Sequence, residues 1–400
     1  MLSSNIGLDH IAVYVPNQYL SSVDLAHARQ IDPNKFTIGI GIKEISVPSP
    51  AEDVVVMAAN AGYQVLQEAG VLPSEIGLLI VGTESAVDGA KPVAIQVHEL
   101  LGIQSACRVY DTIHACIGAT YGVLSALDWL AADSSRSYAL VIASDIARYG
   151  KASPGEPTQG AGAVALLISR HPRLMTLQEI SNYSKNVYDF WKPKEEIYPM
   201  VNGVYSAQCY LEAVTQCFTG LIINQKSTFL YHTPYPKLVQ QAHTQVLEVV
   251  DSTIDKKPHY DKYVSCSSLY PSRVGNIYTG SLWLSLVSFL ENIYASESNS
   301  LIELQEGCYL FSYGSGCSSV LMRGEFSANC REMVQKMKLS LRLEQRVQIS
   351  VEEYEMLMYS PDDVKKNYLN TGYFKFEGIH NKERKYSVCK ETVFFEVENG

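Results

Sequence analysis

The sequence predicts an α/β fold in which strands alternate with helices and pair mainly in parallel. Three observations support this prediction. Short apolar runs of strand length alternate along the chain with longer runs of helical pattern. The strand-like runs are almost continuously apolar, as in "LLIVG" (78–82) and "ALVIA" (139–143), which is typical of strands covered on both faces. With 400 residues and a hydrophobic fraction of 46%, the chain can bury a large core.

In the first part of the chain, each expected element has a local reason. The segment "HIAVYVP" (10–16) alternates as a strand does, and "VDLAHARQ" (23–30) follows as a short helix. Residues 51–70 are rich in alanine and long enough for a helix, and Gly70 marks its end. The elements expected next are a buried strand at 76–85, a helix at 92–102, an apolar helix opened by the stretch around Cys116, and buried strands at 137–145 and 160–170.

The second part of the chain continues the alternation. Residues 227–235 are expected to form a strand that ends in a loop, and residues 236–250 a helix. The apolar run 279–294 predicts another helix, and residues 307–322 predict two strands joined by a Gly-Ser-Gly turn. From about Ser327 onward the composition becomes more charged, which is typical of a solvated, peripheral region.

Composition excludes several classes of protein. The net charge of −10 argues against a nucleic-acid partner, which usually requires a basic face. No apolar run reaches the roughly 18 residues of a membrane span, and the N-terminus does not resemble a signal peptide. The nine cysteines are scattered and include no CxxC pair, so we expect reduced thiols, no metal site and a cytoplasmic location.

Cys116 lies in a run of small residues, "ACIGAT", that opens an apolar helix. A cysteine near a helix N-terminus experiences the positive end of the helix dipole, which can lower its pKa from about 8.5 to between about 3.5 and 7.5. The thiolate formed in this way is a nucleophile. The alternative is an inert core cysteine, which is the commoner role for any one of nine cysteines.

Glu84 and His232 follow buried strands, where the sites of open α/β sheets usually lie. Partial burial would raise the pKa of the Glu84 carboxyl and suit it to proton transfer. A solvated loop glutamate and a structural histidine are the alternatives. Together with Cys116, the two residues could supply a nucleophile, a base and an oxyanion or proton partner, although spacing alone does not show that they converge. The glycine clusters at 157–165 and 312–316 match no phosphate-binding loop.

The ordered motifs of the chain resemble those of 3-hydroxy-3-methylglutaryl-CoA synthases, which are thiolase-like condensing enzymes. The motifs that carry the resemblance are "DPNKFTIGIG" (32–41), "TESAVD" (83–88), "ACIGAT" (115–120), "SDIARYG" (144–150), "GEPTQGAGAVALLI" (155–168), "YDFWKP" (188–193), "YPMVNGVYSAQCYL" (198–211), "HTPYPKLVQ" (232–240), "VGNIYTGSLWLSL" (274–286) and "FSYGSG" (311–316). The resemblance implies a five-layered αβαβα thiolase-like fold with two pseudo-symmetric halves, 1–170 and 171–400, the second with family-specific insertions and a polar, peripheral C-terminal region. It also implies a homodimer.

The resemblance further implies a reaction and the residues that perform it. Acetyl-CoA and acetoacetyl-CoA would condense with water to give 3-hydroxy-3-methylglutaryl-CoA (HMG-CoA) and CoA, in the mevalonate route to isoprenoids, with no cofactor. Cys116 would carry the acetyl group, Glu84 would act as general acid/base, and His232 would orient acetoacetyl-CoA. The implied substrate-binding residues are Asp32, Thr158, Ser206, Lys237, Asn276 and Ser315, and the implied supporting residues are Asp88, Asp145 and Asp189.

Four positions depart from the family pattern. Ile117 stands where an aromatic residue usually follows the nucleophile, and Pro154 where relatives place a polar contact. Gln241 and Asn202 replace a lysine and an aspartate. One alternative function is β-branching on intermediates bound to acyl carrier protein, although the lysine of "HTPYPK" and the "IYTGSLWLSL" motif favour free CoA. The others are a non-catalytic paralogue and a thiol hydrolase.

Overall fold

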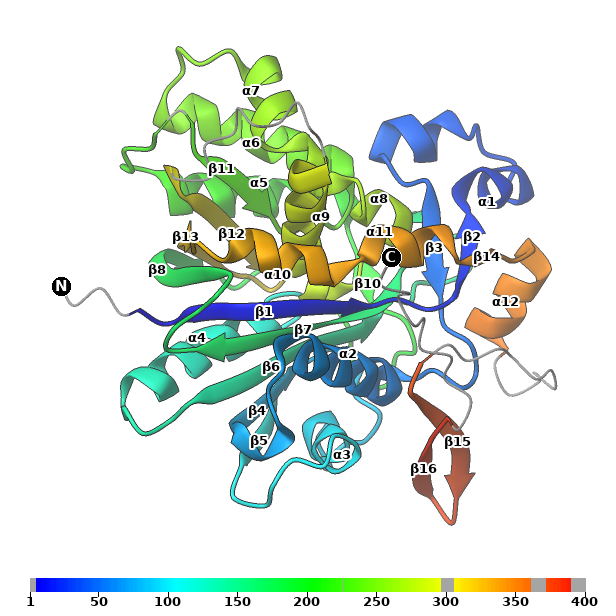
Figure 1. Cartoon of the computed structure of the whole chain (residues 1–400). Coiled ribbons are helices and arrows are strands. Elements are labelled where there is room, and N and C mark those ends of the chain that lie inside the picture. Colours follow the sequence, from blue (N-terminus) through cyan, green and yellow to red (C-terminus); the bar gives the residue numbers. More distant parts are fainter. Residues whose placement is uncertain (1–4, 225, 296–305, 361–371, 390–400) are drawn as a thin grey trace, which may run out of the picture.

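The computed structural model describes residues 5–224, 226–295, 306–360 and 372–389. Nine strands form one mixed sheet in the order β11-β12-β13-β8-β1-β7-β6-β4-β5, with helices packed on both faces (Figure 1). Its strands are β1 (Gly7–Tyr14), β4 (Ile76–Gly82), β5 (Arg108–Thr112), β6 (Tyr138–Ile146), β7 (Ala161–Ser169), β8 (Met175–Ser184), β11 (Thr228–Tyr231), β12 (Cys308–Gly314) and β13 (Ser318–Phe326). The main helices are α2 (Val54–Ala69), α3 (Val93–Leu100), α4 (Gly118–Ala131), α5 (Gly203–Phe218), α6 (Pro236–Val250) and α9 (Ser281–Ala295).

Shorter elements complete the described part of the chain. The short strands are β2 (Gln18–Ser21), β3 (Glu44–Val47), β9 (Phe190–Trp191), β10 (Met200–Val201), β14 (Val347–Gln348), β15 (Phe374–His380) and β16 (Glu383–Val388). The shorter helices are α1 (Ser22–Ala28), α7 (Lys256–Tyr263), α8 (Pro271–Val274), α10 (Cys330–Met337), α11 (Leu339–Glu344) and α12 (Val351–Tyr359). A π-helical turn spans Lys35–Ile40, and 3₁₀ turns span Pro73–Glu75, Glu156–Thr158, Ser265–Ser268 and Tyr278–Gly280.

The main helices begin and end where local chemistry dictates. The Asp53 carboxylate accepts the free N–H of Val56 at the start of α2, and Gly70 ends that helix with φ of 68°. Pro236 occupies the first position of α6, where its missing N–H costs no helical hydrogen bond. These signals lie next to one another in sequence, which explains why the sequence predicted both helices closely.

Four strands in each half of the sheet follow the same pattern of pairing, and the first half has β5 as an additional strand beside β4. Outward from β1, β7 is antiparallel to β1, β6 is antiparallel to β7, and β4 is parallel to β6. Outward from β8, β13 is antiparallel to β8, β12 is antiparallel to β13, and β11 is parallel to β12. The halves meet where β1 pairs with β8. The division at residue 170 nevertheless stays a prediction.

The prediction of mainly parallel pairing is wrong. In the described main sheet, three neighbouring pairs are parallel and five are antiparallel. Parallel neighbours need a long crossover, which the helices provide between β4, β5 and β6. The connections between β6 and β7 and between β12 and β13 contain no such helix, and these strands are antiparallel.

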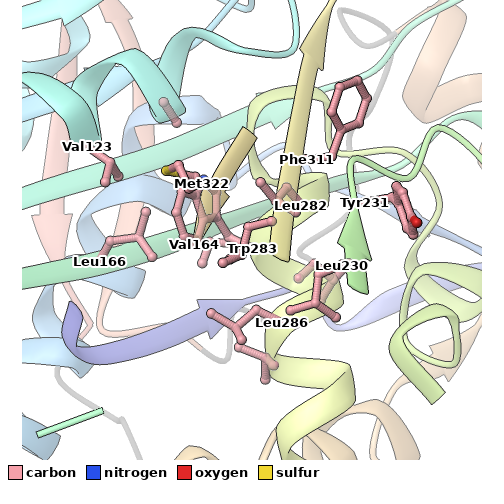
Figure 2. Packing of buried hydrophobic residues seen from close by; sticks show 14 of the residues in the cluster. Val123, Val164, Leu166, Leu230, Tyr231, Leu282, Trp283, Leu286, Phe311 and Met322 are labelled. Atoms are coloured by element: carbon pink, nitrogen blue, oxygen red, sulfur yellow. The ribbon is translucent and has the colours of Figure 1, made fainter. Parts of the chain in front are cut away.

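Helices form the outer and central layers around the two halves. α2 packs on β1, β6 and β7, while α4 packs on the opposite side of β4 and β6. In the second half, α5 packs on β8 and β13, and α9 packs on β11 and β12. Figure 2 shows that the central cluster joins Val123 of α4 and Trp283 of α9 to Val164 of β7 and Met322 of β13. The two halves therefore share one hydrophobic core.

The region after Ser327 is polar, but it is not simply solvated, so that expectation is wrong. Tyr354 of α12 is fully buried and Phe374 of β15 is 2% exposed. Asn60 of α2 and the Phe374 backbone exchange hydrogen bonds, and β14 pairs with β2. The described elements α12, β14 and β15 thus pack on the first half of the chain, while α10 and α11 also contact α9. Among the residues described, none of the helices combines the length and apolar character that a membrane span requires.

Candidate active site

Cys116 and Glu84 come from separate loops and meet in the structure. Glu84 follows β4, and Cys116 lies between β5 and α4. The Cys116 thiol donates a hydrogen bond to Oε1 of Glu84 at 3.5 Å. His232 follows β11 and lines the same pocket as Cys116, which has a cavity volume of about 190 Å³. The structure therefore brings together the three reactive residues that the sequence singled out.

The loop that carries Cys116 is closely confined by its surroundings. Ala115 has φ of 39°, an uncommon value for a residue with a side chain. A Cβ built on Gly314, at the end of β12, would lie 2.6 Å from Cγ2 of Ile117 and 2.8 Å from the His114 carbonyl oxygen. Only glycine allows β12 to approach this loop so closely, so the second half of the chain helps to fix the position of the nucleophile.

The prediction that a helix N-terminus lowers the pKa of Cys116 is wrong. Burial raises the pKa of the thiol well above its usual value, and the neighbouring carboxylates of Glu84 and Asp145 raise it further. The helix α4 begins only at Gly118, and the charged groups closest to the sulfur are acidic. The resting nucleophile is therefore a thiol that must lose its proton during the reaction.

Glu84 is held by a buried carboxylate behind it. Burial raises the pKa of Glu84 to about 8, and the negative charge of Asp145 contributes in the same direction. Oδ1 of Asp145 accepts the Glu84 N–H at 2.9 Å and the hydroxyls of Thr83 and Ser85 at 3.0 and 2.8 Å. Asp145 lies near the end of β6, and burial raises its own pKa to about 6. A rigid strand thus fixes the backbone of the Glu84 loop.

His232 is neutral at physiological pH because burial lowers its pKa to about 3. The backbone N–H of His232 donates to the Phe311 carbonyl at 2.7 Å, and the backbone carbonyl of His232 accepts the Tyr210 hydroxyl at 2.8 Å. Nδ1 of the ring is buried and has no hydrogen-bond partner in the described part of the chain. A neutral imidazole held at a pocket wall can donate a hydrogen bond to a substrate oxygen without carrying a charge.

The comparisons with known proteins decide the family. Residues 2–172 match the family model of the hydroxymethylglutaryl-coenzyme A synthase N-terminal domain, and residues 177–258 and 248–377 match that of the C-terminal domain. The chain belongs to the hydroxymethylglutaryl-CoA synthase family. The fold is therefore the thiolase-like one, and the protein is a condensing acyltransferase, as predicted.

Individual relatives match over nearly the whole chain. The hydroxymethylglutaryl-CoA synthase of Enterococcus faecalis is 36% identical over 390 residues, which cover 95% of this chain and 99% of the relative. A solved structure of MvaS in complex with 3-hydroxy-3-methylglutaryl coenzyme A is 35% identical, with a TM-score of 0.87 over 96% of this chain and 99% of that one. The HMG synthase of the curacin biosynthetic pathway, in complex with apo donor-ACP, is 26% identical, with a TM-score of 0.86 over 96% and 100%.

Four of the six predicted substrate-binding residues of this synthase line the pocket: Thr158, Ser206, Asn276 and Ser315. The other two lie outside the pocket lining. Asp32 is exposed and accepts the Asn34 N–H at 3.0 Å, and Lys237 is exposed on α6 and donates to Gln240 at 2.8 Å.

The three supporting aspartates have different positions. Asp145 lies behind Glu84, as described above. Asp189 is buried at the pocket and accepts hydrogen bonds from the Tyr313 hydroxyl at 2.8 Å and the Ser206 hydroxyl at 3.3 Å. Asp88 is exposed and accepts the N–H groups of residues 90 and 91 in a turn, and it is not part of the pocket lining.

Of the four departures from the family pattern, Pro154 lines the pocket. Ile117 is fully buried in the core and is not part of the pocket lining. Asn202 accepts the Tyr205 N–H at the start of α5, and Gln241 is exposed on α6. The residue next to the nucleophile thus belongs to the hydrophobic core and not to the pocket wall.

The sequence interpretation missed an aromatic wall of the pocket. Tyr149, Phe190 and Tyr278 pack edge-on, with ring centroids 5.9–6.5 Å apart, and Cys116 packs against the cluster that contains Tyr149 and Tyr278. Each lies in a motif that carried the family resemblance, so the aromatic letters in those motifs were the available signal.

The pocket wall between β6 and β7 is braced from outside. Glu156 is 1% exposed and receives two hydrogen bonds from Arg29, both at 2.8 Å. Gln159 accepts the Tyr149 N–H at 2.6 Å and donates to the hydroxyl of Tyr354, on α12, at 2.5 Å. The C-terminal region therefore supports a segment that lines the pocket. The described residues contain no cluster of three His, Cys, Asp or Glu side chains that could hold a metal ion.

Proposed function

We propose that this synthase condenses acetyl-CoA with acetoacetyl-CoA and water to give HMG-CoA and CoA, through an acetyl thioester on Cys116. The observation that carries the proposal is the 3.5 Å contact between the Cys116 thiol and Glu84, in a pocket that His232 also lines. The relative crystallised with 3-hydroxy-3-methylglutaryl coenzyme A supports the choice of product. We also propose a cytoplasmic homodimer acting in the mevalonate pathway without a cofactor.

Acetylation comes first and involves no net gain or loss of protons by the site. The sulfur of Cys116 attacks the acetyl carbonyl, the bond to the CoA sulfur breaks, and the proton that Cys116 loses is gained by that leaving sulfur. Glu84 is not required as a permanent proton acceptor for this step. Its negative charge in fact raises the pKa of the Cys116 thiol.

Carbon–carbon bond formation requires Glu84. Its carboxylate removes a proton from the acetyl methyl group, and a base of pKa about 8 is stronger than an ordinary carboxylate. The resulting enolate attacks the ketone of acetoacetyl-CoA. His232 orients that substrate and polarises the ketone through a ring N–H. The new alkoxide takes up the proton from the Glu84 carboxylic acid, which returns Glu84 to its ionised form. Water then cleaves the thioester to Cys116 and releases HMG-CoA.

Two variants test whether Cys116 is needed for acetylation and Glu84 for condensation. After incubation with acetyl-CoA, mass spectrometry should find an acetyl adduct on the wild type and on Glu84→Ala, but not on Cys116→Ser. Glu84→Ala should form no HMG-CoA when acetoacetyl-CoA is added. Equal labelling of Cys116→Ser would remove Cys116 from its role, and normal condensation by Glu84→Ala would remove Glu84. Rapid release of acetate without condensation in the wild type would instead favour a thiol hydrolase.

A second candidate is β-branching on a carrier-bound acyl group. The similarity to the curacin HMG synthase, which was crystallised with a donor-ACP, favours it specifically. A comparison of condensation rates on acetoacetyl-CoA and on acetoacetyl-carrier protein tests the choice. We expect a preference for free acetoacetyl-CoA, and a strong preference for the carrier-bound substrate would overturn the first proposal.

A further inference from the structure

Thr279 belongs to the second half of the chain but binds the buried carboxylate behind Glu84. Its hydroxyl lies 2.6 Å from Oδ2 of Asp145 and 3.0 Å from the Gly82 carbonyl oxygen, and its N–H donates to Oδ2 at 3.2 Å. Thr279 is 1% exposed, so water does not compete for these hydrogen bonds. The strand end that precedes Glu84 and the carboxylate that holds Glu84 therefore share one partner.

The turn that presents Thr279 is itself rigidly held. Oδ1 of Asn276 accepts the Tyr278 N–H at 2.9 Å and the Ser281 hydroxyl at 2.7 Å. The Ser281 hydroxyl also accepts the Ile277 N–H at 3.1 Å. α9 starts at Ser281, so the turn is anchored to the central layer. Thr279 can thus hold Asp145 from a fixed position.

The two oxygens of Asp145 have different kinds of partner. The donors to Oδ1 are the Glu84 N–H and the hydroxyls of Thr83 and Ser85, so all three belong to the Glu84 loop itself. In the described part of the chain, both hydrogen bonds to Oδ2 come from Thr279. Thr279 therefore holds Asp145 from outside the Glu84 loop.

We propose that Thr279 is a positioning residue for carbon–carbon bond formation, because it holds Asp145 in place behind Glu84 from outside the Glu84 loop. The inference rests on the proposed role of Glu84 as the base. It adds that Thr279, a residue of the second half of the chain, influences the pKa of Glu84 in the first half.

The expected effect on pH dependence follows from the charges around Glu84. The titratable groups that face it are Asp145, Cys116, Lys192, Tyr149 and Tyr278. The hydrogen bond from Thr279 lowers the pKa of Asp145 and so favours its negative charge, which in turn raises the pKa of Glu84. Without the Thr279 hydroxyl, Asp145 would hold its proton to higher pH. Glu84 would then face a neutral neighbour and would ionise at lower pH.

The experiment compares Thr279→Val with Thr279→Ser. For Thr279→Val, we expect the acid limb of the kcat–pH profile of condensation to move toward acid by about half a unit to one unit. Acetylation of Cys116 should be no slower than in the wild type. Thr279→Ser keeps the hydroxyl and should restore the wild-type limb. If Thr279→Val does not fold, Thr279→Ala removes the same hydroxyl without placing a methyl group against Asp145.

Thr120→Val is the matched control for the loss of a buried hydroxyl, since Thr120 bonds Ser312 at 2.8 Å and makes no hydrogen bond to Asp145 or Glu84 in the described structure. Its acid limb should stay in place. An unmoved limb in Thr279→Val and Thr279→Ala, or an equal shift in Thr120→Val, would overturn the inference. Normal condensation by Glu84→Gln would overturn the proposed function instead, so the two failures can be told apart.

Discussion

Replacing Gly314 with alanine should impair acetylation of Cys116, because the new methyl group forces β12 away from the nucleophile loop. The added Cβ would lie 2.6 Å from Cγ2 of Ile117, 2.8 Å from the His114 carbonyl oxygen and 2.9 Å from the Ile117 nitrogen. Carbon atoms pack at about 3.5–4.0 Å, so the loop must retreat by roughly 1 Å. We expect a loss of stability of about 2 kcal/mol, typical of overpacking. A displacement of about 1 Å predicts a fall in the acetylation rate on the order of 100-fold.

The assay is the initial rate of acetyl-adduct formation from acetyl-CoA, measured by mass spectrometry beside thermal unfolding. Gly89→Ala is the control, because an added Cβ there meets no atom within 4 Å. The double variant Gly314→Ala with Ile117→Ala should not recover, since two of the three close contacts are with backbone atoms. Wild-type acetylation by Gly314→Ala, or full recovery in the double variant, would refute the reasoning.

Two further predictions concern pH and the brace behind the pocket. Because Glu84 must be ionised to act as a base and has a pKa of about 8, kcat for condensation should rise with pH through that value; a kcat that is flat from pH 6 to about 9 would contradict this. Arg29→Met should destabilise the fold by about 3 kcal/mol, because it leaves the Glu156 carboxylate buried without its cation. Lys151→Met, which removes a half-exposed ion pair with Glu355, should cost less than about 1 kcal/mol, and denaturant unfolding of both variants checks the difference.

Much of the secondary structure could be predicted because its signals are local. The sequence predicted a helix over 236–250, and α6 spans Pro236–Val250. It also predicted that a helix ends at Gly70, which the structure confirms. In contrast, β8 was not expected, because most of its residues are polar and only Met175 and Leu177 are buried. Strand direction was predicted wrongly, since pairing depends on contacts between residues far apart in sequence.

The site residues were likewise predicted where their signals are local and missed where they depend on distant segments. The sequence singled out Cys116, Glu84 and His232 because reactive residues follow apolar strands there, and the family motifs extended that choice. It could not predict the raised pKa of Cys116, which comes from burial and from carboxylates on two other segments. It assigned no role to the aromatic wall or to Thr279, whose partner Asp145 lies 134 residues away.

The sequence by itself determined the family, the residue types of the reactive set and most of the elements that carry them. Apolar periodicity, helix ends and short motifs are properties of neighbouring residues, so the chain displays them before it folds. Only the tertiary structure decided which strands pair antiparallel, which predicted ligand residues reach the pocket and which proton state each group prefers. Those properties depend on desolvation and on charges from distant segments, and both arise only when the two halves pack together.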